Sequence, residues 1–219
     1  MSSREQILGS IRSHLAASRP YDPPESLFSP TLTAAPSTTS LVDLFKQSLE
    51  AVDGHCLVVQ SEDELTQILK KFGPRIAISD APILDRLGLV PSTANIFEID
   101  VGISTAQAAI AETGTLVLDS ARERHRLVSL VPPVHIAIID ASSIFQTLGE
   151  ALAFIHQNGN ISPAVTFITG PSRTADIELT LTIGVHGPQE LYVIVNEGPP
   201  LTRQGRGGLG NPVVEEKDA

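Results

Sequence analysis

From residue 41 onward the sequence alternates short apolar runs with amphipathic runs, and this alternation limits the possible folds more than any other feature. The apolar runs, such as 134–139 and 191–195, are rich in Val, Ile and Leu. Apolar strands that are separated by helices are typical of a parallel sheet that is covered on both faces. The sequence therefore predicts an α/β fold with a mainly parallel sheet.

Capping signals and apolar periods place the predicted elements along the chain. Ser61-x-x-Glu64 is a capping box that opens a helix, and Gly73-Pro74 ends this helix. The predicted helices are 41–52, 61–71, about 142–157 and 173–182, with a short one from residue 81. The predicted strands are 55–60, 75–79, 95–100, 115–119, 134–139, 165–169 and 191–195.

The two ends of the chain differ from this central part. Ser2-x-x-Glu5 predicts a short amphipathic helix, which a linker with five prolines between residues 19 and 40 follows. Such a helix either docks on a neighbour or is a frayed terminus, and the sequence favours neither. We therefore expect a helix and linker over 1–40, an α/β domain over 41–197 and a flexible tail over 198–219.

Charge and cysteine content exclude several classes of function. Fifteen basic and 25 acidic residues give a net charge of −10, which disfavours nucleic-acid binding. The single cysteine, Cys56, cannot build a zinc or iron–sulfur site within the chain, and the histidines are too scattered for a metal site. The N-terminus lacks a secretory apolar region, and no apolar run is long enough to span a membrane. We expect a cytoplasmic protein without a metal or cofactor of its own.

A strand followed by a polar turn makes residues 168–178 the first candidate site. Gly170 follows the predicted strand, and Ser172 or Thr174 would cap the predicted helix beside Arg173. Backbone N–H groups at a helix N-terminus, together with hydroxyls and a guanidinium, bind carboxylate or phosphate. The alternative is a helix cap in which Arg173 pairs with a neighbouring acid. Because ligands of parallel sheets lie at the carboxyl ends of strands, we expect an anion site at that edge.

Small and hydroxyl-bearing residues make 103–115 the second candidate site. Ser104 and Thr105 could donate hydrogen bonds, and Thr113-Gly114 forms a tight entry into the next predicted strand. Glu112 could act as a nucleophile or a general base. The alternative is that the small residues pack a helix against the sheet and that Glu112 is an exposed loop acid.

The third candidate is a cluster of arginines that follows the predicted strand 115–119. Arg122, Arg124 and Arg126 could clamp an anionic ligand or contact an acidic partner, or could simply face solvent at a helix start. The scattered histidines, His135 among them, are expected to be structural.

Several of these segments together resemble the LUD domain family, in its short LutC/YkgG type. The resemblance is carried by 101–115, by 124–133, by 169–178 and by Gly184-Val185-His186-Gly187-Pro188, and it is looser before residue 100. It implies a three-layer α/β/α sandwich of the NagB/RpiA/CoA-transferase-like kind. It also implies a bacterial system that oxidises L-lactate to pyruvate, in which two cysteine-rich partner proteins hold the iron–sulfur clusters.

Two functions remain open at this stage. In the first, the chain is an accessory, non-redox subunit that binds a small anionic substrate and the two iron–sulfur proteins; a homodimer is compatible with the sequence, because sheet-edge packing is easily reused. In the second, it is a stand-alone transferase- or ligase-like enzyme that acts on an anionic metabolite through Glu112 and Arg173. The absence of a recognisable redox ligand set in the sequence favours the first.

Overall fold

The computed structural model describes residues 3–17, 40–79, 86–120, 126–157, 164–175, 181–183 and 186–201. The chain divides into two compact units, Met1–Thr33 and Ala34–Ala219. In the first unit α1 (Ser3–Ala17) confirms the predicted N-terminal helix, and its Ile7 and Ile11 side chains are exposed. The predicted Pro-rich linker lies outside the described residues except for Ser40, which caps the next helix.

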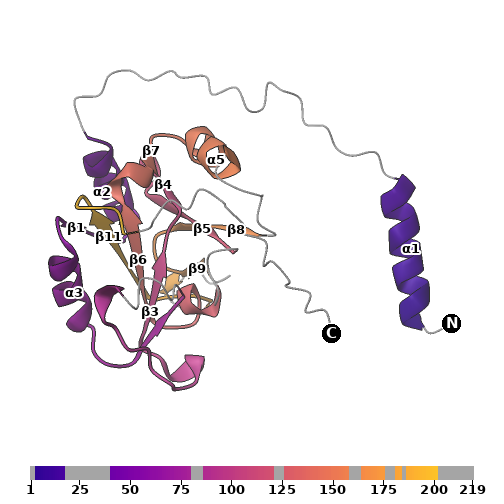
Figure 1. Cartoon of the computed structure of the whole chain (residues 1–219), viewed down its shortest axis with the longest axis horizontal. Helices are drawn as coiled ribbons and strands as arrows, with labels where there is room; N and C mark the ends of the chain where they lie inside the picture. The colour runs from indigo at the N-terminus through magenta and orange to yellow at the C-terminus, as the bar shows by residue number, and fades with distance from the viewer. Residues whose placement is uncertain are drawn as a thin grey trace, which may run out of the picture. The chain divides into compact units, whose positions relative to one another are not determined.

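A five-stranded sheet forms the centre of the second unit, and its strand order is β1-β11-β6-β3-β2. The strands are β1 (His55–Val59), β2 (Ile76–Ile78), β3 (Val101–Thr105), β6 (Val134–Asp140) and β11 (Glu190–Asn196). Every neighbouring pair in this sheet is parallel (Figure 1). The predicted α/β class with a mainly parallel central sheet is therefore confirmed.

A second, mainly antiparallel sheet has the order β7-β4-β5-β8, and the sequence analysis did not predict it. It contains β4 (Ala108–Ile110), β5 (Thr115–Asp119), β7 (Ile144–Phe145) and β8 (Val165–Thr169). The predicted strands 115–119 and 165–169 are thus confirmed as strands, but they pair antiparallel to each other. Within the small-residue run 106–111, Ala108–Ile110 form strand β4 rather than a helix.

Helices begin where side-chain caps are available. Ser40 caps α2 (Leu41–Glu50) and Ser61 caps α3 (Glu62–Lys70), as their sequences predict. The third helix, α5 (Leu148–Gln157), begins later than residue 142, because the 3-10 helix η4 (Ala141–Ser143) and strand β7 precede it. The predicted strand 95–100 is wrong, since a side-chain cap from Asn95 opens the 3-10 helix η2 (Ile96–Glu98).

The predicted helix 173–182 is also wrong. β9 (Arg173–Ala175) and β10 (Leu181–Ile183) pair antiparallel instead. Thr174, Thr182 and Ile183 are β-branched, and such residues favour the extended backbone over a helix. The predicted short helix from residue 81 begins in a segment outside the described residues.

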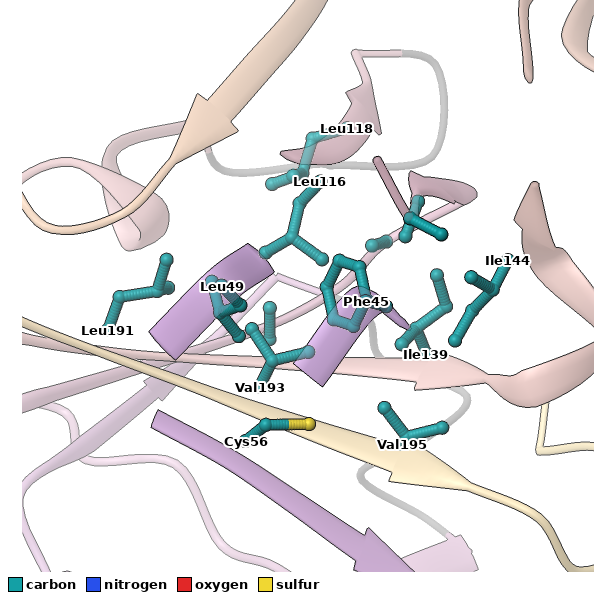
Figure 2. Packing of buried hydrophobic residues seen from close by; sticks show 14 residues of the cluster. Phe45, Leu49, Cys56, Leu116, Leu118, Ile139, Ile144, Leu191, Val193 and Val195 are labelled. Atoms are coloured by element: carbon teal, nitrogen blue, oxygen red, sulfur yellow. The ribbon is translucent and has the colours of Figure 1, made fainter. Parts of the chain in front are cut away.

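Apolar side chains fill the spaces between these layers. Helix α2 lies between the two sheets, and Figure 2 shows its Phe45 and Leu49 between Leu116 of β5 and Val193 of β11. Helix α3 packs on the opposite face of the parallel sheet, where Leu65 and its neighbours form a second cluster. Helix α5 covers the outer face of the second sheet. Within the described part of the chain, no helix combines the length and hydropathy that a bilayer crossing needs.

Candidate functional site

The structure separates the predicted site residues that were expected to meet at the carboxyl edge of the sheet. Ser104 and Thr105 end β3 and are buried. Arg173 forms an ion pair with Asp53, which lies two residues before the start of β1 and so at the opposite, amino edge. The backbone N–H of Ser172 likewise donates to the carbonyl of Pro188, just before β11. The cause is the antiparallel direction of β8, which carries the chain to the amino edge of the central sheet.

The amino edge gathers two of the predicted turns around the C-terminal end of α2. Gly114 (φ 64°) and Gly170 (φ 74°) both adopt left-handed conformations. A Cβ atom at Gly114 would overlap the backbone of Leu49, and one at Gly170 would overlap the carbonyl of Val52. Only glycine permits this approach without strain, so both glycines have a structural role in bringing the turns to α2.

Three threonine hydroxyls link these turns. The Oγ1 atom of Thr115 lies 2.7 Å from Oγ1 of Thr113 and 2.7 Å from Oγ1 of Thr169. Three hydroxyls that form two hydrogen bonds retain one O–H group that can donate to a further acceptor. We call these residues, together with Ser172 and Arg173, the amino-edge cluster. An exposed guanidinium near hydroxyl donors is suited to a small carboxylate.

The remaining predicted residues take different positions. Glu112 is exposed in the turn between β4 and β5, where its backbone N–H donates to the carbonyl of Gln146 at 3.2 Å. Thr174 lies in β9, opposite Thr182. Arg126 begins the 3-10 helix η3 (Arg126–Ser129), whereas Arg124 lies outside the described residues.

A buried hydrogen-bonded pair links β3 to β6, and its histidine was expected to have a structural role. Oγ of Ser104 is 2.8 Å from Nε2 of His135, whose side chain is completely buried. No described residue contacts its other ring nitrogen, Nδ1, through a hydrogen bond. Burial lowers the pKa of His135 to about 4, so the ring is neutral at physiological pH. No sequence signal identifies this pair, because it forms only when β3 and β6 become neighbours.

At the carboxyl edge the chain's own residues occupy the position where ligands of parallel sheets commonly bind. Oδ1 of the buried Asp140 accepts hydrogen bonds from Nδ2 of Asn196 at 2.8 Å and from the backbone N–H of Leu201 at 3.0 Å. Arg86 donates to the carbonyl of Leu201, whose side chain is buried. Residues 198–201, the start of the predicted flexible tail, are therefore packed against the domain. The geometry favours the amino edge as the functional site.

Comparisons with known proteins identify relatives of this chain. The LUD domain profile matches residues 92–195. A "Lactate utilization protein C" from Geobacillus sp. (strain WCH70) is 42% identical over 193 residues, which cover 74% of this chain and 80% of that protein. Proteins with the same name from Geobacillus thermodenitrificans and Bacillus subtilis are each 40% identical over 105 residues, and these matches span only 44% of each relative.

A solved structure has a related fold. The crystal structure of a DUF162 family protein from Deinococcus radiodurans superimposes with a TM-score of 0.55 at 25% sequence identity. The match covers 71% of this chain and 96% of that chain. The likeness thus extends over almost the whole of the solved protein.

Proposed function

The chain belongs to the LUD domain family, and from this premise we propose that it takes part in bacterial lactate utilisation as an accessory, non-redox subunit. The support is the 42% identity to a lactate utilization protein over 80% of its length. We further propose that the chain works in the cytoplasm with two cysteine-rich iron–sulfur proteins, and that it can form a homodimer. In this scheme the partner proteins carry the electrons, and this chain binds a small anionic substrate or product.

The amino-edge cluster is the proposed anion site, and the position of Arg173 is the observation that carries this proposal. Its side chain is 37% exposed and pairs with Asp53, whose side chain is 73% exposed. An ion pair this exposed contributes at most about 1 kcal/mol, so a ligand carboxylate can compete with Asp53 for the guanidinium. One N–H group faces Asp53, and a guanidinium carries five, which leaves donors for a bidentate contact.

Complementation of a deletion strain tests this proposal. Deletion of the gene from its host should abolish growth on L-lactate as sole carbon source, and the wild-type gene should restore it. Arg173→Ala should lose about 10- to 150-fold in affinity for the anion and fail to restore growth, because a charge-assisted hydrogen bond is lost. Arg173→Lys should restore growth poorly, since the planar fork is absent.

Arg75→Ala is the matched control for this experiment. Arg75 forms an exposed ion pair with Asp100, with 2.6 Å between Nε and Oδ2. The pair precedes β2 and β3, at the end of the strand order opposite to β1, and neither residue belongs to the amino-edge cluster. This variant should grow normally. A folded Arg173→Ala protein that supports normal growth on L-lactate would show that Arg173 is only a surface ion-pair residue.

The alternative, a transferase- or ligase-like enzyme, requires Glu112 as the reacting group. Glu112→Gln keeps the size of the side chain and removes its nucleophilic carboxylate. The accessory-subunit proposal expects this variant to restore growth on L-lactate, whereas the enzyme alternative expects it to fail.

A further inference from the structure

The hydrogen-bond inventory of the buried pair identifies which atom lacks a partner. A neutral imidazole carries one N–H and a serine carries one O–H, so Ser104 and His135 share two polar hydrogens. If Nε2–H donated to Ser104, both the serine hydroxyl and Nδ1 would need another partner. If Ser104 donates to Nε2, only the Nδ1–H donor remains. Burial favours the second arrangement, because it leaves fewer unsatisfied buried groups.

Two small residues lie on the same face of the parallel sheet as the buried pair. The bond between Ser104 and His135 places both on the same face, and strand alternation places Gly102 and Ala137 there too. Gly102 lies directly opposite His135 in the register. The carbonyl of Val128 in η3 approaches so closely that a Cβ at Gly102 would overlap it.

Backbone hydrogen bonds connect the start of β6 to the amino-edge cluster. His135 is the second residue of β6, and the carbonyl of Pro133, just before β6, accepts from Gln189 at 2.7 Å. Pro188 in turn accepts the hydrogen bond of Ser172 at 2.9 Å. A short chain of backbone contacts thus connects the two regions.

We propose that the Nδ1–H of His135 is a ligand-contacting donor, which binds a carboxylate or carbonyl oxygen of a small acid. A donor requires an acceptor oxygen, and no described residue supplies one to Nδ1. The burial of the donor strengthens such a contact, because water does not compete for it. This inference rests on the proposed function, since it takes the ligand to be the small anion of that proposal.

Two substitutions test the roles of the two ring nitrogens of His135 separately. In His135→Gln the side-chain amide reaches the position of Nε2, so the contact with Ser104 is kept and the Nδ1 donor is lost. In His135→Asn the amide lies near the position of Nδ1, so the donor is kept and the contact with Ser104 is lost. His156→Gln, on the exposed end of α5, is the control.

The test uses the full chain labelled with ¹⁵N-histidine, titrated with L-lactate and with pyruvate at pH 7.5. The signals of His135 are assigned by their absence in His135→Gln. We expect the ligand-free spectrum to show a proton on Nδ1 and the Nδ1 signal to shift saturably with at least one of the two acids. In calorimetry His135→Gln should bind that acid about 2- to 10-fold more weakly, while His135→Asn and His156→Gln bind it more tightly than His135→Gln does.

The outcomes distinguish this inference from the proposed function. Calorimetric binding of either acid without a shift at Nδ1, or with unchanged affinity in His135→Gln, would overturn the inference and leave the proposed anion site standing. A ligand-free spectrum with the proton on Nε2 would also overturn it. If neither acid binds the wild type, both the inference and the proposed anion site are wrong.

Discussion

The neutral, buried His135 should make the folded protein sensitive to mild acid. Its pKa is about 4 in the folded chain, against 6.5 for the free side chain, because burial disfavours the charged ring. The folded pKa is the lower one, so the unfolded chain binds more protons between pH 6.5 and pH 4. Stability is therefore fully present above pH 6.5 and is lost as the pH falls through this window.

The expected size of this loss follows from the two pKa values. Each pKa unit corresponds to about 1.4 kcal/mol, so the ring contributes about 2 kcal/mol to the loss of unfolding free energy between pH 7.5 and pH 5. Urea unfolding followed by circular dichroism at both pH values measures the total change. Subtracting the change in His135→Gln removes the contribution of the carboxylates, since glutamine does not titrate. Wild type and His135→Gln that lose the same free energy between these pH values would refute the reasoning.

Two further predictions concern the packing of the core and of the turns. Gly114→Ala should lower the unfolding free energy by about 1–3 kcal/mol in urea denaturation, because the φ of 64° at Gly114 and the backbone of Leu49 both exclude a Cβ. A variant as stable as the wild type would contradict this explanation. Gly149→Ala is its control, since a Cβ at that position in α5 would meet only Oγ1 of Thr147, at an ordinary contact distance of 3.9 Å, and alanine should stabilise the helix by about 0.5–1 kcal/mol. Burial raises the pKa of the Cys56 thiol to about 11, so Cys56 should resist a disulfide reagent at pH 8 until denaturant is added. Rapid labelling of the native protein would show that this strand is accessible.

Much of the fold follows from local patterns in the sequence. Ser61-x-x-Glu64 predicts the start of α3 because the cap involves residues only three positions apart, and the structure has that cap. The strands 55–60, 134–139 and 191–195 are predicted by apolar runs, which remain apolar because both faces of the sheet are covered. Such features depend on neighbours along the chain, so the sequence alone determines them.

The arrangement of the candidate site depends on contacts between residues far apart in the sequence, which no local sequence pattern predicts. The run 165–169 predicts a strand but not its direction, and the antiparallel pairing of β8 with β5 carries Arg173 to the amino edge rather than to Ser104. The hairpin of β9 and β10 stands where a helix was predicted. Pairing between the two strands stabilises the extended backbone, and the spacing of apolar residues along the sequence does not reveal such pairing. His135 became a buried donor only when β6 paired with β3, whose paired residues lie 33 positions earlier in the sequence. Pairing between distant strands, which is a property of tertiary structure alone, thus decided which residues meet.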